Sequence, residues 1–278
     1  MNILITGSSG QLGEEIARQL SSEHRITGVD LRAGEFTTHA GTVTDRKLVF
    51  ELVKGMDAII HTASLHAPHV GRFTKEQFIE VNVKGTLHLL EAAVEHKVRR
   101  FIYTSTTSLY GFAMIPRNKA VWVTEELVPQ PRDIYDITKL AAEQLCKNFA
   151  LEHGLSCICL RTSRFWDEPP ALKMIYRLYR GVDVRDAAAA HCLALHNTDI
   201  EFEIFNISAQ SPFNENDTDE LLHDARKVIN RYYPSAEKIF GERGWEMPES
   251  IDRVYVISKA KKLLGYDPRH NFEELMQQ

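Results

Sequence analysis

The first thirty residues constrain the fold of this chain more than any other segment. Asn2 to Thr6 is a short apolar run that predicts a buried strand, and a glycine-rich segment from Gly7 to Gly13 follows it directly. The next apolar residues recur at helical spacing, and a second strand is expected from Ile26 to Val29, ending at Asp30. This order of strand, glycine turn, helix, strand and acid is typical of a dinucleotide-binding βαβ unit.

Each residue type in this unit has a physical role. Glycines let the backbone turn tightly and approach a pyrophosphate, which then lies against the N–H groups at the positive end of the helix. The carboxylate of Asp30 is placed to accept hydrogen bonds from a ribose diol. Within the turn, the expected cofactor-binding residues are Gly7, Ser9, Gly10, Gln11, Leu12 and Gly13.

Asp30 also bears on which dinucleotide binds. The additional 2′-phosphate of NADP would face this carboxylate, so NAD is the expected cofactor. Arg32 lies two residues further on, and its guanidinium could neutralise that phosphate. NADP therefore stays open as the less favoured alternative.

Composition limits the class of protein. A chain of 278 residues suits one large domain with a small appended lobe, and a net charge of −5 provides no basic field for nucleic acid or acidic membranes. No apolar run approaches the roughly 18 residues that span a bilayer, and no signal peptide is expected. The cysteines have no metal-binding spacing, so reduced thiols in a cytoplasmic protein are expected: Cys146, Cys157, Cys159 and Cys192.

Strand-like and helical segments alternate along the chain. This βαβα order predicts an α/β fold, a Rossmann-type doubly wound parallel sheet with helices on both faces. Residues 1–161, with return segments in 182–208, are expected to form the dinucleotide-binding domain, and residues 162–181 and 209–278 a small C-terminal substrate lobe. Beyond the first unit we expect helices at Arg46–Val53, Phe78–His96 and Ile134–His153, and strands at Ala58–His61, Arg100–Thr104, Ser156–Leu160 and Glu203–Ile207.

A second group of residues carries chemistry. Tyr135 and Lys139 are one helical turn apart, and Asp133 is a good N-cap just before them, so both should lie on one face near the start of a helix. A phenol with a pKa near 10 is a poor base at neutral pH. A neighbouring lysine and the positive nicotinamide ring are both expected to lower the pKa of Tyr135.

The strand before this helix runs into a hydroxyl-rich loop, from Thr104 to Ser108, followed by Tyr110-Gly111. Together with the Gly-x-x-Gly-x-x-Gly turn, these motifs resemble the extended branch of the short-chain dehydrogenase/reductase superfamily, and within it the NAD-dependent epimerase/dehydratase family, which is UDP-glucose 4-epimerase-like. The resemblance implies that Thr106 binds the substrate hydroxyl or carbonyl, Tyr135 moves the proton, and Lys139 holds the nicotinamide ribose and tunes Tyr135.

The resemblance also implies further site residues. It places Thr62, Ala63, Ser64 and Thr104 beside the cofactor, and His66 and Thr107 near the substrate. Arg161 and Arg164 could hold a phosphate or carboxylate, although a surface salt bridge is an equal reading for Arg164. His66 and His69 have no third ligand at metal-binding spacing, so no metal site is expected. The long apolar helices pair across a dimer in relatives, which implies a homodimer.

Two departures from the family narrow the reaction. Sugar 4,6-dehydratases carry an Asp-Glu pair after the catalytic Thr, where this chain has Thr107 and Ser108, so elimination of water is not expected. The segment from Phe165 to Tyr179 is short compared with the insertion that grips the nucleotide in nucleotide-sugar enzymes. This implies a smaller substrate or a looser grip.

Three functions remain open. The overall pattern slightly favours a nucleotide-sugar epimerase-like enzyme, in which a hydride leaves a sugar carbon and returns to its other face. The alternative is a simple NAD-dependent dehydrogenase or reductase of a free sugar, a uronate or another small carbonyl compound. The third is a non-catalytic dinucleotide-binding sensor, which would have no need of Thr106, Tyr135 and Lys139.

Overall fold

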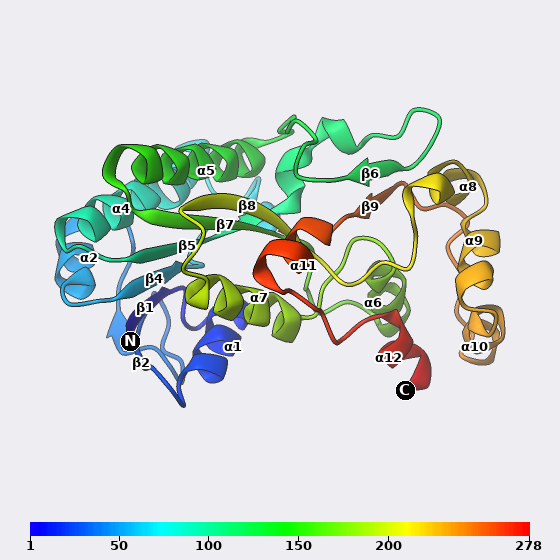
Figure 1. Cartoon of the computed structure of the whole chain (residues 1–278), viewed down its shortest axis with the longest axis horizontal. Coiled ribbons are helices and arrows are strands. Elements are labelled where there is room, and N and C mark those ends of the chain that lie inside the picture. Colours follow the sequence, from blue (N-terminus) through cyan, green and yellow to red (C-terminus); the bar gives the residue numbers. More distant parts are fainter.

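A seven-stranded sheet organises the molecule (Figure 1). The computed structural model describes residues 1–278, and every neighbouring pair of strands in this sheet is parallel. The predicted α/β doubly wound fold is therefore confirmed. The strands run in the order β3 (His39–Ala40), β2 (Arg25–Asp30), β1 (Asn2–Thr6), β4 (Ala58–His61), β5 (Arg100–Thr106), β7 (Ser156–Thr162) and β8 (Phe202–Ile207).

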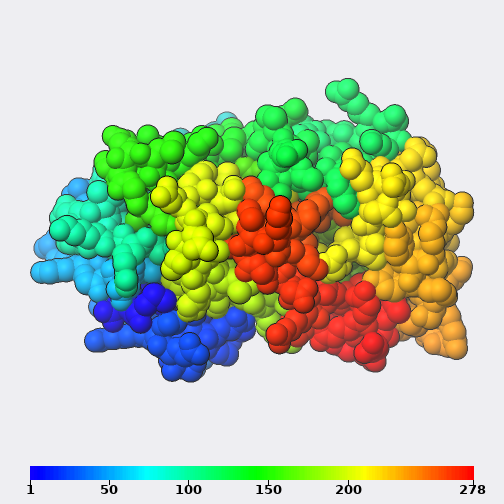
Figure 2. Space-filling view, viewed as in Figure 1, coloured from blue at the N-terminus to red at the C-terminus, as the bar shows by residue number.

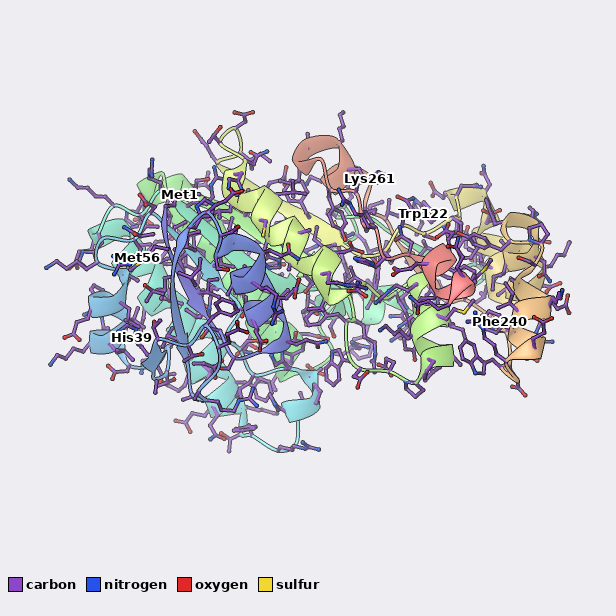
Figure 3. The ribbon with its side chains drawn as sticks, turned by 90° about the horizontal axis from the view of Figure 1, so that it is seen from below. Met1, His39, Met56, Trp122, Phe240 and Lys261 are labelled. Carbon is purple, nitrogen blue, oxygen red and sulfur yellow. The ribbon has the colours of Figure 1, made fainter.

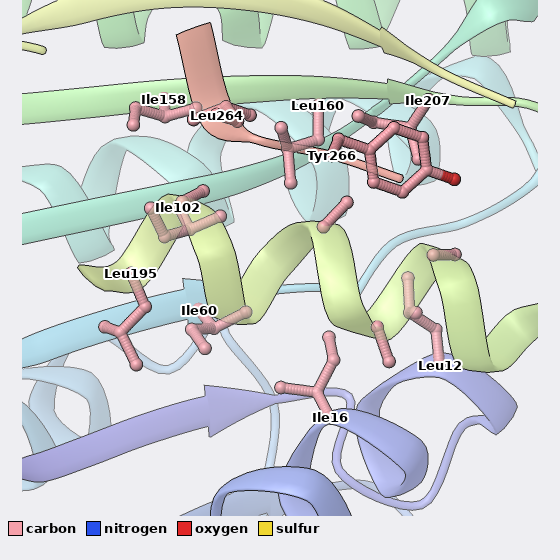
Figure 4. Packing of buried hydrophobic residues seen from close by; sticks show 14 of the residues in the cluster. Leu12, Ile16, Ile60, Ile102, Ile158, Leu160, Leu195, Ile207, Leu264 and Tyr266 are labelled. Carbon is pink, nitrogen blue, oxygen red and sulfur yellow. The ribbon is translucent and has the colours of Figure 1, made fainter. Parts of the chain in front are cut away.

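Helices cover both faces of this sheet, because successive residues of each buried strand point to opposite sides. On one face, Ile60, Ile102 and Ile158 pack against Leu12 and Ile16, as Figure 4 shows. That face carries α1 (Gln11–Leu20), α7 (Val184–His196) and α11 (Ser258–Leu264). The opposite face carries α2 (Arg46–Val53), α4 (Gly85–Glu95) and α5 (Ile134–His153).

The helix predicted from Phe78 to His96 is interrupted. The structure has a short helix α3 (Lys75–Phe78), a π-helical turn (Ile79–Lys84) and then α4. Within the turn, the side chain of Asn82 bonds both the N–H and the C=O of Leu65 and also reaches Thr138. These contacts tie the loop after β4 to helix α5, and a local π-bulge is a common device at such functional joints.

A separate lobe lies at the other end of the molecule (Figures 1 and 2). It contains a two-stranded parallel sheet of β6 (Val121–Val123) and β9 (Arg253–Tyr255). Its own apolar core includes Phe240, with Trp122 packed against that core, and both lie at the lobe end of Figure 3. The helices of the lobe are α6 (Pro170–Arg177), α8 (Thr218–His223), α9 (Ala225–Tyr232), α10 (Ala236–Glu242) and α12 (Phe272–Gln277).

The expected domain boundaries need two corrections. β6 comes from within residues 1–161 but pairs with β9 of the lobe. Helix α11 lies within residues 209–278, yet Ala260, Leu264 and Tyr266 pack into the core of the large sheet. Both differences arise because apolar side chains are buried against the nearest complementary surface, whatever their place in the sequence. Short 3₁₀ turns complete the chain at Ala67–His69, Thr107–Tyr110, Phe112–Met114 and Glu215–Asp217.

Two further features concern the thiols and the helices. All four cysteines are free, as expected for reduced thiols, and Cys146, Cys157 and Cys159 are buried. None of the helices combines the length and the apolar character needed to cross a membrane.

Candidate active site

The glycine turn between β1 and α1 has the shape that a bound pyrophosphate needs. Gly7 has a φ of 73°, a conformation that L side chains rarely adopt, and its N–H donates to Val29 at 2.8 Å. A Cβ on Gly13 would lie 2.2 Å from the carbonyl oxygen of Gly7, so only glycine fits there. Helix α1 starts after Gly10 without a side-chain cap, which leaves amides of its first turn open to an anion.

Asp30 lies at the end of β2 beside this turn. Its two carboxylate oxygens accept the backbone N–H groups of Ser9 at 3.1 Å and Arg32 at 3.0 Å. The hydroxyl of Ser9 donates to the carbonyl of Arg32 at 2.7 Å. These bonds fix the carboxylate at the edge of the turn, and a carboxylate has lone pairs left for two ribose hydroxyls. The residues present therefore fit the adenosine end of NAD.

The loop after β4 closes the other side of the turn. Thr62 donates its hydroxyl proton to the carbonyl of Thr6 at 2.7 Å. A Cβ on Gly7 would lie 2.7 Å from the Thr62 hydroxyl and 2.8 Å from the Ala63 nitrogen. This contact places Thr62 and Ala63 directly against the glycine turn, and Ser64 follows them into the neighbouring cavity.

A cavity of about 290 Å³ opens where β4, β5 and β7 end and the lobe begins. Parallel sheets of this kind bind their ligands at the carboxyl ends of the strands. Eight of the predicted site residues line this one cavity. Thr106, Tyr135 and Lys139 were predicted as catalytic, Ser64 and Thr104 as cofactor-binding, and His66, Thr107 and Arg164 as substrate-binding.

The expected lowering of the Tyr135 pKa is wrong for the protein without cofactor. Tyr135 is buried, and burial raises the pKa of its phenol to about 12, against a smaller lowering by the Thr106 hydroxyl. Lys139 is not among the groups that shift this pKa, and its Nζ donates to the carbonyl oxygen of Thr104 at 2.6 Å. The phenol is therefore protonated until further positive charge enters the cavity.

Lys139 is itself strongly affected by its surroundings. Burial lowers the pKa of Lys139 to about 7, although the carboxylate of Glu143, one turn further along α5, works in the opposite direction. The ammonium also lies 4.3 Å from the ring centre of Tyr103. A lysine of this kind is poised between its charged and neutral forms at physiological pH.

Arg161 does not belong to the substrate site, which corrects the expectation from sequence. It is buried and forms a two-point ion pair with Glu143, with Nε and Nη2 at 2.9 and 2.7 Å from the carboxylate. Glu143 also accepts the hydroxyl proton of Ser105. This ion pair connects α5 to β5 and β7 beneath the catalytic residues. The sequence signal that could have revealed it is an acid one turn after Lys139.

The remaining predicted residues lie at the cavity wall. Arg164 is half-buried, pairs with Glu168, and its guanidinium lies 5.4 Å from the ring of Trp166. Trp166 lines the cavity and is 44% exposed. The rings of His66 and His69 lie 5.8 Å apart, and no group of three metal-ligating side chains occurs in the structure.

The charge of the cavity was not foreseen from the sequence. No Asp or Glu lines it, whereas Lys139 and four arginines do: Arg132, Arg164, Arg180 and Arg253. The arginines come from four separate segments of the chain, so no local motif brings them together. Clefts lined by one sign of charge concentrate ligands of the opposite sign.

A second and larger hollow, of about 610 Å³, lies between α1, α7 and the segment after α11. Its lining mixes Glu15, Asp186 and Asp267 with Arg185 and Arg269, and it shares no residue with the catalytic cavity. Its size alone does not make it the active site, because it holds neither the glycine turn nor the Tyr135–Lys139 pair.

Known proteins with similar sequences include several sugar-processing enzymes. The chain is 28% identical to the low-salt glycan biosynthesis protein Agl12 of Haloferax volcanii, over 99% of this chain and 96% of that protein. It is 32% identical to a dTDP-glucose 4,6-dehydratase of Streptomyces niveus, over 58% of this chain and 53% of the other. It is 25% identical to a uronate dehydrogenase of Pseudomonas putida, over 62% of this chain and 64% of the other.

Solved structures share the fold over the whole chain. A short-chain dehydrogenase/reductase superfamily protein of Agrobacterium tumefaciens with bound NAD has a TM-score of 0.76 at 20% identity, covering 100% of this chain and 95% of that one. UDP-glucose 4-epimerase of Thermotoga maritima has a TM-score of 0.74 at 21% identity, covering 100% and 96%. The model of the NAD dependent epimerase/dehydratase family matches residues 3–166. Because this match spans more than half of the chain, the protein belongs to the NAD dependent epimerase/dehydratase family.

Proposed function

We propose that this protein is an NAD-dependent dehydrogenase that oxidises or reduces a carbon of a small anionic sugar, such as a uronate. One observation carries the proposal. The cavity beside Thr106, Tyr135 and Lys139 is lined by four arginines and by no carboxylate, in a protein whose net charge is −5. Arg132, Arg164 and Arg253 pair with carboxylates outside the cavity lining, and it is the arginines themselves that line the cavity, which favours an anionic substrate.

The residues of the cavity have complementary roles. Thr106 and Tyr135 bind the hydroxyl of the reacting carbon, and Tyr135 accepts its proton during oxidation. NAD, when bound, supplies the hydride acceptor. The positive charge of Lys139 beside that of the nicotinamide favours proton loss from Tyr135. This is needed because burial, only partly offset by the Thr106 hydroxyl, raises the pKa of the phenol to about 12. Gly7 to Gly13 and Asp30 hold the pyrophosphate and the adenosine ribose.

The size of the cavity supports a small substrate. Sites for drug-sized ligands measure roughly 300 to 1,000 Å³, and the cavity of about 290 Å³ is at the lower limit of that range. The segment between β7 and α7 contains only one short helix, α6. A uronate fits this space better than a nucleotide sugar, whose base and two phosphates need a longer groove.

A nucleotide-sugar epimerase is the second candidate, since UDP-glucose 4-epimerase of Thermotoga maritima shares the fold and the arginines could also bind a diphosphate. Elimination of water is less well supported, although a 4,6-dehydratase is among the relatives. It needs an acid and a base beside the substrate, and no Asp or Glu lines the cavity.

The candidates differ in net turnover of the cofactor. The protein is mixed with NAD and, in separate reactions, with glucuronate, galacturonate, the matching neutral sugars and UDP-glucose, and absorbance of reduced nicotinamide is followed. We expect NADH to accumulate with a uronate. An isomerised nucleotide sugar without net NADH would establish the epimerase instead. Binding of NAD without reaction of any substrate would support a sensor.

A further inference from the structure

Asp136, the residue after Tyr135, is a buried carboxylate with an unusual set of partners. Its side chain is 0% exposed. Its Oδ2 accepts the backbone N–H of Arg132 at 3.2 Å and the side-chain Nε of the same arginine at 3.3 Å. Burial raises the pKa of Asp136, and contacts with Ser108 and Arg132 partly offset that effect. A buried carboxylate with this arrangement fixes the arginine it binds.

The other end of Arg132 reaches the catalytic loop. Its Nη2 donates to the hydroxyl of Ser108 at 2.9 Å, two residues after Thr106. The guanidinium thus bridges the start of α5, which carries Tyr135, and the loop that carries Thr106. Both Arg132 and Ser108 line the cavity.

Arg132 keeps donors free for a ligand. A guanidinium has five N–H donors, and three bonds use three of them: Nε to Asp136, and Nη2 to the hydroxyl and the carbonyl oxygen of Ser108. The two N–H groups of Nη1 have no partner among these residues. The side chain is 41% exposed, on a cavity wall without any carboxylate. Its planar fork matches a carboxylate better than a hydroxyl or a carbonyl group.

We propose that Arg132, oriented by Asp136 and Ser108, is the specificity-determining residue that binds a carboxylate on the sugar ring undergoing reaction. This inference rests on the proposed function and names the group that recognises its substrate. Asp136 acts through Arg132 and is a positioning residue.

The position of Arg132 distinguishes it from the other arginines of the cavity. Arg180 and Arg253 come from the lobe, and Arg164 from the segment leading to it, where Arg164 pairs with Glu168. Arg132 alone belongs to the segment that presents Tyr135, the group that marks the reacting carbon. A carboxylate on the same ring lies within its reach, whereas the phosphates of a nucleotide sugar extend away from that ring.

The test compares an acid with its neutral counterpart. Glucuronate and glucose differ in a carboxylate against a hydroxymethyl group, and both are assayed with NAD on wild type, Arg132→Gln, Arg132→Lys and Asp136→Asn. A lost bond to a charged group corresponds to roughly 10- to 100-fold in binding. We expect Arg132→Gln to reduce the preference for glucuronate over glucose by about that factor, mainly through KM.

The other variants separate charge from geometry. Arg132→Lys keeps the charge without the fork and is expected to restore part of the preference. Asp136→Asn should shift the preference in the same direction as Arg132→Gln but less. Arg117→Gln, on an exposed loop outside the cavity, is the matched control and should retain wild-type kinetics. Affinity for NADH, measured by fluorescence, should be unchanged in all four variants, which also reports correct folding.

Failure of the inference and failure of the proposed function give different results. If wild type oxidises neither sugar, the proposed dehydrogenase is wrong for these substrates, and calorimetric binding of glucuronate and glucose to the protein–NAD complex tests Arg132 directly. An unchanged preference for the acid in Arg132→Gln, in kinetics or in binding, would overturn the inference. So would an equal loss of affinity for UDP-glucose and glucuronate, because that result would assign the arginine to a phosphate.

Discussion

Individual residues of the catalytic cavity owe their properties to burial more than to their partners. Lys139 and Tyr135 were expected to form a pair in which the ammonium activates the phenol. Instead, Lys139 donates to the carbonyl of Thr104, and burial favours the neutral form of both side chains. Burial thus opposes charge on both side chains, in place of the charge pairing that the spacing suggested.

Replacement of Tyr135 by Phe tests the proton transfer. The variant keeps the ring but loses the hydroxyl, so kcat should fall by about 10²- to 10⁴-fold, the usual contribution of general acid–base catalysis. Affinity for NADH should stay within about twofold, because the glycine turn and Asp30 are untouched. Steady-state kinetics and fluorescence titration measure the two quantities. Tyr232→Phe, which removes a lobe hydroxyl bonded to Asp217, is the control. Full turnover by Tyr135→Phe would remove Tyr135 from the mechanism.

Because burial lowers the pKa of Lys139, we predict that the stability of the protein depends on pH. Its pKa is about 7 in the folded protein against 10.5 for an ordinary lysine. Between these values the unfolded chain binds the extra proton, so the contribution of Lys139 to the free energy of unfolding rises with pH, and below pH 7 the cost of the buried charge is fully present. Relative to wild type, Lys139→Met should lose about 2 to 3 kcal/mol of stability between pH 6 and pH 9.

Urea denaturation of the cofactor-free protein at pH 6, 7.5 and 9 measures this difference. The unpaired carbonyl of Thr104 in the variant adds a cost that does not depend on pH. The change of the stability difference with pH therefore tests the pKa of Lys139, and its absolute size does not. Lys147→Met, an exposed lysine on the same helix, should show no such slope. The assigned pKa would be contradicted if Lys139→Met and wild type differed by the same amount at every pH.

The bounds of helices and strands agree closely with those predicted from the sequence wherever residues at the ends of the element set them. Helices α2 and α5 and strand β4 have the predicted bounds, because Asp45 and Asp133 cap the helices and the strand is a continuous apolar run. The π-helical turn around Asn82 was missed, since it depends on contacts with Leu65 and Thr138, which are distant in sequence. The helical spacing of apolar residues in that segment does not reveal such contacts.

The site residues also fall into two groups: those that belong to local sequence patterns and those that only the fold brings together. The glycine turn, Asp30 and the Tyr135–Lys139 spacing are local patterns, and the sequence was sufficient to identify them. The arginines of the cavity and the Glu143–Arg161 ion pair are assembled from separate segments. Arg161 looked like an anion ligand because its neutralising partner lies on another element.

The glycine turn gives a prediction at the level of an element. In Gly13→Ala the new Cβ would lie 2.2 Å from the carbonyl oxygen of Gly7, so the turn and the start of α1 must move. We expect affinity for NADH to fall at least tenfold and stability to fall by about 1 to 3 kcal/mol, as for overpacked sites. Fluorescence titration and thermal denaturation measure these effects.

The control variant is Gly241→Ala in α10, where a Cβ meets nothing within 4 Å. It should instead raise stability by up to about 1 kcal/mol. Wild-type affinity in Gly13→Ala would show that the turn is not the pyrophosphate site.

The whole molecule consists of a sheet domain and a lobe at its two ends (Figure 1). Residues of both parts line the cavity that contains Tyr135 and Lys139. The cavity takes Thr106 from the end of β5, Tyr135 and Lys139 from the start of α5, and Arg180, Arg253 and Tyr255 from the lobe.

We predict a homodimer formed through helix α5. Its outer face carries Ile137, which is 52% exposed, and Leu151, which is 75% exposed, and these residues share one side of the helix. Exposed apolar side chains grouped on one helix face are typical of an interface.

The mass of the protein in solution tests this assignment. At micromolar concentration, light scattering should give twice the chain mass of 31.7 kDa. The double variant Ile137→Glu, Leu151→Glu should give a single chain mass and still bind NADH, because burying a carboxylate at the contact is costly. The control, Val128→Glu with Leu263→Glu, places charges at other exposed apolar positions and should stay dimeric. A wild-type mass of one chain, or a dimer that survives both charges on α5, would contradict this assignment.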